Sequence, residues 1–142
     1  MQRRTGTEYV RKIEFVFYHE REIREAILDA REGASAQSVR NKNKISNPTA
    51  AKALRNITPL RSVRVCGAPL EWPEHWMQVV DAVYSWCTGD LLVVARDRYS
   101  GVDYADTCVK LSISTKTYYN LLTCVRQHAA LCAVQLGVIK VC

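Results

Sequence analysis

Five side chains around position 117 have the types and spacing needed to contact the edges of DNA bases. Each can donate or accept a hydrogen bond, and they lie close together in the chain: Thr115, Lys116, Thr117, Tyr119 and Asn120. Asn pairs well with adenine, and Lys pairs with guanine or a phosphate. A helix about 10–12 Å in diameter fits the major groove, so these side chains at the start of a helix predict binding to double-stranded DNA.

The surrounding residues 103–122 have the pattern of two short helices separated by a tight turn at residues 112–114. Asp103 is expected to cap the first helix with its carboxylate, and Ser114 to cap the second. Three apolar residues are expected to pack the second helix onto its partner: Tyr118, Leu121 and Leu122. An αα-hairpin that binds no nucleic acid would share these positions and stays open as an alternative, although the run of hydrogen-bonding residues favours DNA.

The whole chain has 142 residues, the size of one domain or of a small domain with an arm, and 48% of them are apolar. It contains no continuous apolar run long enough for a membrane span and no signal-like segment after its basic N-terminus. We therefore expect a cytoplasmic protein without a membrane partner.

The cysteines and histidines do not have the spacing of a metal site. Six cysteines are present, at positions 66, 87, 108, 124, 132 and 142. No two of them have the short separation of a zinc knuckle, and most occupy apolar helical positions where a free thiol acts as a small hydrophobic group. The chain also lacks a recognisable catalytic triad and a Gly-rich phosphate loop. We expect no metal, no cofactor and no enzymatic activity.

The excess positive charge lies in the middle of the chain. The formal net charge is +6, and residues 33–70 contain no acidic residue, whereas residues 1–32 are balanced and residues 71–142 are nearly so. The basic residues of this middle segment are Arg40, Lys42, Lys44, Lys52, Arg55, Arg61 and Arg64. Fixed positive charge attracts the phosphates of DNA, so the segment is expected to hold the backbone. A solvated linker is the alternative.

The first part of the chain predicts one long helix over residues 8–32, because apolar residues recur at three- and four-residue steps. This helix could brace the C-terminal domain or pair with a second copy. Gly33 is expected to end it, residues 50–56 to form a short helix after Asn47-Pro48-Thr49, and residues 66–69 to form a turn or linker.

From Trp72 onward the pattern predicts consecutive helices. Pro73 is expected to open a helix with one buried face, composed of Trp76, Val79, Val80, Val83 and Cys87. Trp72, Trp76 and Trp86 are interpreted as core and helix-contact residues. Gly89 is expected to end this helix in a left-handed conformation, and Asp90 to cap the next one, over residues 91–99. The last helix is expected to continue to Leu136 with a core or partner-facing stripe of Leu121, Val125, Ala129, Cys132 and Leu136.

The order of these elements, with Asp106-Thr107-Cys108 and Leu111-Ser112-Ile113-Ser114, resembles region 4 of sigma factors. Thr117-Tyr118-Tyr119 and Asn47-Pro48-Thr49 further resemble the phage ArpU and RinA family of late-gene transcription regulators. The resemblance covers residues 72–137, and residues 47–55 weakly. It implies a DNA face composed of Thr115, Lys116, Thr117, Tyr119 and Asn120. Cys108 replaces the usual Ala, and Ser112 replaces the usual Gly of the turn.

The expected fold is all-α, a C-terminal sigma region 4-like helix-turn-helix bundle with a long N-terminal helix. Its parts are the helix at 1–33, a basic linker with a short helix at 34–71, and the DNA-binding domain at 72–142. The expected function is sequence-specific DNA binding by a phage transcription regulator. Contacts to DNA are expected at Thr115, Lys116, Thr117, Tyr119, Asn120, Arg40, Lys42, Lys44, Lys52 and Arg55. RNA polymerase is a further candidate partner, and dimerisation is open. The alternative function is that of a small terminase subunit or another phage packaging protein.

Overall fold

The computed structural model describes residues 2–40 and 58–139, and the side chains of residues 8–32 and 58–139. These residues are mostly helical, with one small two-stranded sheet. They form two compact units. Met1–Tyr18 and Trp76–Cys142 make up what we call the helical unit, and His19–His75 make up the hairpin unit.

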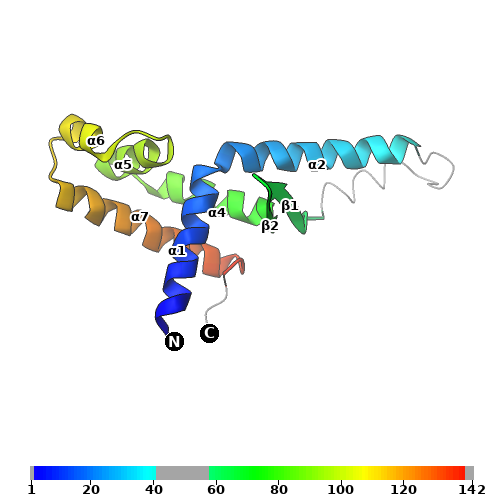
Figure 1. The fold of residues 1–142 in the computed structure, drawn as a ribbon, viewed down its shortest axis with the longest axis horizontal. Coiled ribbons are helices and arrows are strands. Elements are labelled where there is room, and N and C mark those ends of the chain that lie inside the picture. Colours follow the sequence, from blue (N-terminus) through cyan, green and yellow to red (C-terminus); the bar gives the residue numbers. More distant parts are fainter. Residues whose placement is uncertain (1, 41–57, 140–142) are drawn as a thin grey trace. The chain divides into compact units, whose positions relative to one another are not determined.

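The helical unit is built from α1 (Gln2–Tyr18), α4 (Pro73–Trp86, from Trp76 onward), α5 (Gly89–Tyr99), α6 (Tyr104–Leu111) and α7 (Thr115–Gln135). Helix α7 packs against α1, α5 and α6 (Figure 1). Apolar side chains at helical spacing are buried along each contact face. The core includes Ile13, Val16, Phe17, Trp76, Val79, Val80, Val83, Val94, Ala95, Tyr118, Leu122, Val125, Ala129 and Ala133.

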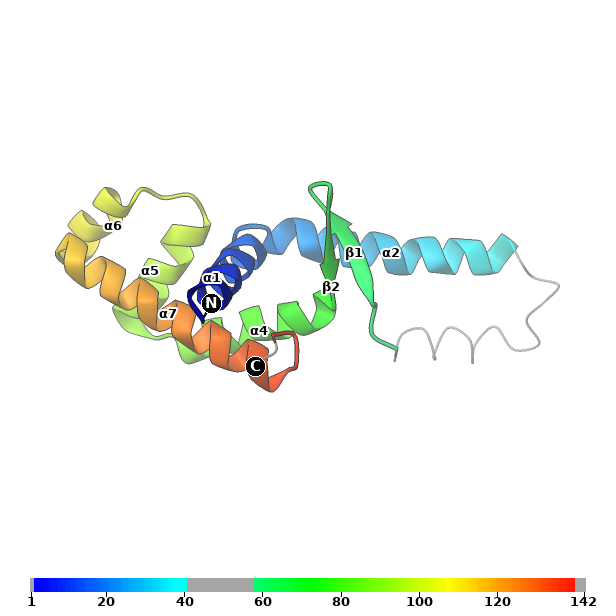
Figure 2. The same cartoon turned by 60° about the horizontal axis from the view of Figure 1, so that its bottom comes forward.

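The hairpin unit contains α2 (Glu20–Arg40), β1 (Ser62–Val65) and β2 (Ala68–Glu71). The strands are antiparallel, with Val63 opposite Leu70 and Val65 opposite Ala68. Strand β1 lies against α2 (Figure 2), and Ile23 of α2 is buried together with the inward side chains Val63, Val65 and Leu70.

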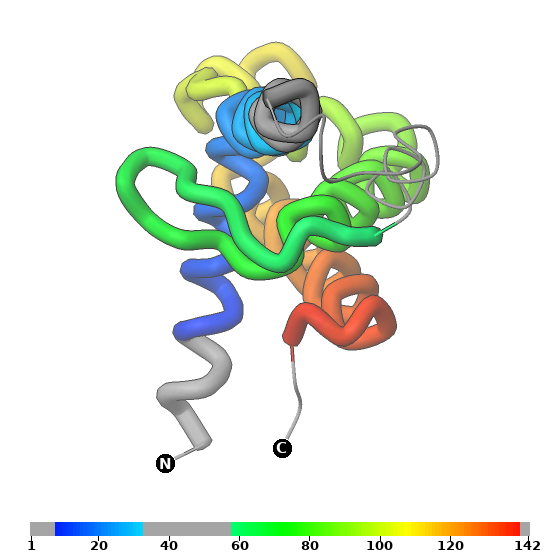
Figure 3. Tube along the Cα trace, turned by 90° about the vertical axis from the view of Figure 1, so that its right-hand side faces the viewer, coloured from blue at the N-terminus to red at the C-terminus, as the bar shows by residue number. Residues whose placement is uncertain are grey.

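A tight two-residue turn joins β1 and β2, seen as the green loop in Figure 3. Cys66 and Gly67 occupy it with φ angles of 51° and 80°. Two consecutive left-handed residues are typical of a type I′ turn, whose twist matches that of the paired strands. The prediction of an all-α chain is therefore confirmed only in part, since most of the described residues are helical but residues 62–65 and 68–71 are strands. The turn predicted over residues 66–69 is present at Cys66-Gly67, and Ala68 and Pro69 belong to β2.

The single helix predicted over residues 8–32 is wrong, since α1 ends at Tyr18 and α2 begins at Glu20. His19 lies in a turn between them, although its carbonyl still accepts a bond from the Ile23 amide at 2.8 Å. The two helices contribute apolar residues to different units, so a continuous apolar pattern concealed the break. Helix α2 also continues past Gly33, the predicted end, since one glycine costs a helix only about 1 kcal/mol.

The predictions for α4 and α5 are confirmed in part. The expected buried face of α4 is present. Gly89 has the predicted left-handed φ of 56°, but it does not end α4, which stops at Trp86. Of the three tryptophans, however, only Trp76 is buried, because Trp72 and Trp86 are 40% and 47% exposed. Helix α5 begins at Gly89, and its capping residue is Thr88 rather than Asp90, with no capping bond from the side chain.

Candidate nucleic-acid interface

Helices α6 and α7 are joined by Ser112, Ile113 and Ser114, the turn that the sequence predicted. Ser112 is left-handed, with φ 55° and ψ 45°, and the amides after α6 donate to carbonyls of its last turn. This geometry satisfies the free carbonyls at the end of α6. A non-glycine residue in this conformation costs about 1 kcal/mol, so the packing around the turn must offset the cost.

Ser114 caps α7 as predicted. Its Oγ accepts a hydrogen bond from the Thr117 amide at 3.1 Å and donates one to Thr117 Oγ1 at 2.9 Å. Asp103 precedes α6 as predicted, but its carboxylate makes no capping bond. Its backbone carbonyl accepts the amides of Asp106 and Thr107, and the residue is exposed to solvent.

Helix α6 is held to α5 by polar contacts that the sequence analysis did not anticipate. Thr107 is fully buried, and its hydroxyl donates to Asp97 Oδ2 at 3.0 Å. Lys110 Nζ forms an ion pair with the same oxygen at 2.6 Å. Lys110 is thereby paired with a carboxylate of its own unit. Lys116 is the exposed lysine at the start of α7. No local pattern in the sequence indicated these contacts, because Asp97 belongs to α5 whereas Thr107 and Lys110 belong to α6.

The first turns of α7 present the predicted polar residues to solvent. One side of the helix is anchored by Tyr118 and Leu122, both fully buried, while Leu121 is only half-buried. All five predicted side chains are exposed: Thr115, Lys116, Thr117, Tyr119 and Asn120. At about 100° per residue, Lys116 and Asn120 lie on the side of α7 opposite the buried residues.

Two further exposed residues, Thr123 and Gln127, continue this polar face along α7. They follow Asn120 at steps of three and seven residues, so helical spacing could have identified them. The Thr123 hydroxyl donates a hydrogen bond to the Tyr119 carbonyl at 2.8 Å, so its oxygen can still accept hydrogen bonds. Gln127 keeps both a donor and an acceptor.

A second polar cluster lies where α1, α5 and α7 meet. Glu14 Oε1 accepts a hydrogen bond from the Tyr99 hydroxyl at 3.1 Å and forms an ion pair with Arg126 Nε. Burial, together with the adjacent Glu14 carboxylate, raises the pKa of Tyr99 well above its ordinary value. Its residues lie far apart in the chain, so no local pattern revealed this cluster. It ties α7 to α1 and α5.

The basic residues expected to hold the DNA backbone belong to the hairpin unit or lie outside the described residues. Arg40 is the last residue of α2, and its side chain is among those not described. Lys42, Lys44, Lys52 and Arg55 lie outside the described residues. Arg61 and Arg64, from the same basic segment, are exposed on the hairpin unit. The described side chains of the helical unit carry equal numbers of basic and acidic groups.

The described residues show no other obvious site. Within residues 2–40 and 58–139, no three potential metal ligands gather in one place. The helices in this part of the chain are all too short or too polar to cross a membrane. Of the cysteines, Cys87 is buried as predicted, Cys108 and Cys132 are half-buried, and Cys124 is exposed.

Comparisons with protein-family models, with curated proteins and with solved structures find no match to this chain.

Proposed function

We propose that this protein is a sequence-specific DNA-binding transcription regulator of phage late genes, resembling the ArpU and RinA family. The observation that carries the proposal is the exposed polar start of α7, which follows a three-residue turn and is anchored on its opposite side by Tyr118 and Leu122. That arrangement supports a sigma region 4-like motif in which α6 positions α7.

In this function, the first turns of α7 enter the major groove. Lys116 and Asn120 lie one helical turn apart on the outward side, so both reach neighbouring base pairs. Thr115 and Thr117 flank them. The amide of Thr117 is already bonded to Ser114, but the helix N-terminus still favours a phosphate through the partial positive charge of its dipole.

Affinity and selectivity come from different parts of the chain in this proposal. The described helical unit has no excess of positive charge, so α7 supplies base contacts more than general attraction. The basic segment of residues 33–70 supplies the attraction to flanking phosphates, since affinity follows the number of phosphates neutralised.

The test uses a random-sequence duplex library to select a binding site, followed by titration of that site in the presence of nonspecific competitor. Lys116→Glu and Asn120→Ala are each expected to weaken binding to the selected site by about 5- to 150-fold, because a good base contact contributes about 1–3 kcal/mol. Binding to competitor should change far less for Asn120→Ala.

Lys12→Glu is the matched control for charge, because Lys12 is an exposed lysine on α1 of the same unit. It should leave selected-site binding within about twofold of the wild type. Failure of the wild-type protein to enrich any sequence would overturn the proposed function. Equal binding by Lys116→Glu, Asn120→Ala and the wild type would overturn the assignment of α7.

A further inference from the structure

Two exposed tyrosines lie side by side where α6 packs against the start of α7 (Figure 2). Tyr104 is the first residue of α6 and is 41% exposed, and Tyr119 in the first turns of α7 is 42% exposed. Their ring centres are 6.0 Å apart. We call Tyr104 and Tyr119 the tyrosine pair. The two residues belong to different helices, so only the packing of α6 on α7 brings them together.

A third ring, that of Tyr118, lies beneath the tyrosine pair. Tyr118 is fully buried, and its ring meets that of Tyr119 edge-on, with the centres 5.1 Å apart and the planes at 89°. The Tyr104 ring lies 6.2 Å from the Tyr118 ring. Aromatic contacts of this kind favour one arrangement of the rings. Because a buried neighbour already orders the pair, binding a ligand costs it little side-chain freedom.

The hydroxyl groups of the pair are free to bind a ligand. In the part of the chain whose side chains are described, neither hydroxyl has a hydrogen-bond partner. Tyr99, by contrast, donates its hydroxyl to Glu14. An exposed aromatic ring with a free donor suits a ligand that has an acceptor beside an apolar surface. The backbone of DNA has both, in its phosphate oxygens and its sugar.

The position of Tyr119 on α7 fits the backbone of DNA better than its bases. At about 100° per residue, Tyr119 lies about 100° around α7 from Asn120 and about 60° from Lys116. It therefore belongs to the flank nearest α6, since it contacts Tyr104. A helix about 10–12 Å in diameter nearly fills a major groove about 12 Å wide. Its outward side then meets the bases, and its flanks meet the walls of sugar and phosphate.

The acidic residues of α6 are consistent with DNA on the tyrosine side. Asp106 is exposed and lies two residues beyond Tyr104, or about 200° around the helix, so it is on the opposite side. Its carboxylate repels phosphates from that side. Asp103 is exposed just before Tyr104 and opposes a phosphate at this end of α6. The contact that the pair makes is therefore expected to be a modest one.

We propose that the tyrosine pair binds the sugar-phosphate backbone of one DNA strand through its two hydroxyl groups, an inference that rests on the proposed function. Tyr104 is then a DNA contact on α6 that the sequence did not indicate, and Tyr119 contacts the backbone rather than a base. Contacts to phosphate fix the orientation of a protein on the duplex without carrying sequence information. The pair thus positions α7 so that Lys116 and Asn120 reach the bases.

The test removes each hydroxyl and keeps the ring, in Tyr104→Phe and Tyr119→Phe of the full chain. Each variant should bind the selected site and a nonspecific duplex about 2- to 10-fold more weakly, by the same factor for both. A neutral hydroxyl releases no counterion, so the slope of log affinity against log salt should not change. Fluorescence anisotropy at several salt concentrations measures both quantities.

Tyr18→Phe is the matched control, because Tyr18 on α1 of the same unit is 41% exposed and loses the same group. It should bind both duplexes within about twofold of the wild type. Unaltered binding by either variant of the pair would overturn the proposal. A loss confined to the selected site would mean that the tyrosine reads a base, and a slope reduced by about one unit would mean that a charged contact was lost. Either result would also overturn it.

The outcomes separate this inference from the proposed function. A wild type that selects no sequence, but whose binding to the nonspecific duplex falls in both variants, keeps the backbone contact and overturns the proposed function. A wild type that selects a site which both variants bind equally well keeps the function and overturns the contact. A protein that binds neither duplex overturns both.

Discussion

Glu14 connects three helices of the helical unit through one carboxylate oxygen, which binds both Tyr99 and Arg126. The other oxygen of Glu14 is buried and makes no hydrogen bond. A largely buried pair of opposite charges stabilises a fold only while both partners remain, because either one alone is left poorly solvated. The cluster therefore fixes the position of α7 more than it adds to the total stability.

Replacing Tyr99 with Phe should change the response of the protein to alkaline pH. Burial and Glu14 raise the pKa of Tyr99 in the folded state, so above about pH 10 the unfolded chain loses a proton that the folded protein retains. The free energy of unfolding should then fall by about 1.4 kcal/mol per pH unit more steeply in the wild type than in Tyr99→Phe.

Urea denaturation at several pH values from neutral to alkaline measures this difference. Near pH 7 the variant should be less stable by about 0.5–1.5 kcal/mol, the usual contribution of one hydrogen bond. Parallel stability curves for the two proteins at alkaline pH would contradict the contribution assigned to Tyr99.

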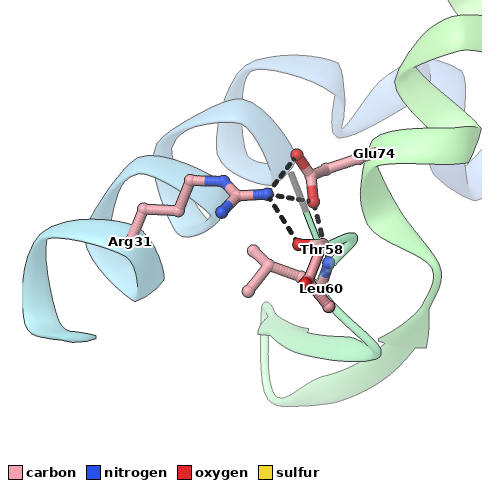
Figure 4. A network of polar contacts seen from close by, with 4 residues as sticks. All are labelled: Arg31, Thr58, Leu60 and Glu74. Atoms are coloured by element: carbon pink, nitrogen blue, oxygen red, sulfur yellow. Dashed lines mark hydrogen bonds and ion pairs between the residues drawn. The ribbon is translucent and has the colours of Figure 1, made fainter. Parts of the chain in front are cut away.

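At the scale of elements, the hairpin unit depends on a contact between the start of α4 and α2. Arg31 Nη2 lies 2.7 Å from each carboxylate oxygen of Glu74 and also donates to the Thr58 carbonyl (Figure 4). The Leu60 amide donates to Glu74 Oε1 at 2.8 Å. One carboxylate thus connects α2 to the segment that enters β1.

Glu74→Gln should weaken the hairpin unit at neutral pH and have little effect in acid. Although burial acts in the opposite direction, the hydrogen bonds from Arg31 and Leu60 lower the pKa of Glu74 below its ordinary 4.5. The stabilisation is therefore present above pH 4.5 and is lost as the pH falls through the lowered pKa. At pH 7 the expected loss is about 1–2 kcal/mol, reduced by partial exposure of both partners.

Hydrogen exchange of the β1 and β2 amides, compared at pH 7 and near pH 3, measures this effect after correction for the intrinsic exchange rate. Glu71→Gln is the control, since Glu71 is an exposed carboxylate at the end of β2. An equal loss of protection for both variants at pH 7 would show that Glu74 has no special part.

The hairpin turn offers a second prediction at this scale. Cys66 has a left-handed backbone at the first turn position, where Asn is preferred over other residues before Gly. Cys66→Asn should therefore raise the free energy of unfolding by about 0.5–1 kcal/mol. Thermal denaturation under reducing conditions measures it. Gly67→Ala, at φ 80°, should have the opposite effect, and a higher melting temperature for that variant would refute a type I′ turn.

At the scale of the whole molecule, the basic segment and the α7 face differ in what they are expected to supply. The segment of residues 33–70 carries all of the net positive charge, yet most of its basic residues lie outside the described part of the chain. Attraction to phosphates requires only local charge density, whereas base contacts require fixed geometry. The attraction to phosphates and the base contacts can therefore be separated by measuring how binding depends on salt concentration.

Replacing Lys42 and Lys44 together with Gln should weaken binding to all DNA sequences alike. Each lost phosphate contact is expected to reduce the slope of log affinity against log salt by about one unit, so the double variant should lose up to about two. Fluorescence anisotropy with a nonspecific duplex at several salt concentrations measures the slope. Lys12→Gln, on α1, should leave it unchanged; an unaltered slope for the double variant would remove this segment from the DNA contact.

The sequence by itself determined the helices from Pro73 to Gln135 and the turn at Ser112, because these depend on local signals. Apolar spacing predicted the buried face of α4, and Ser114 predicted the start of α7 through a bond to an amide only three residues away. The polar residues Lys116 and Asn120 followed from the same helical spacing.

Only the tertiary structure decided which core each apolar residue joins. The pattern from Ile13 to Ile27 is continuous in the sequence, but α1 and α2 contribute to separate units, so the helix breaks at His19. The β-hairpin depends on pairing between strands and on burial against α2, which a short alternating run does not reveal. The contacts of Glu14 and Asp97 join residues from different helices. Such contacts depend on where the chain returns in space, and local periodicity carries no information about that.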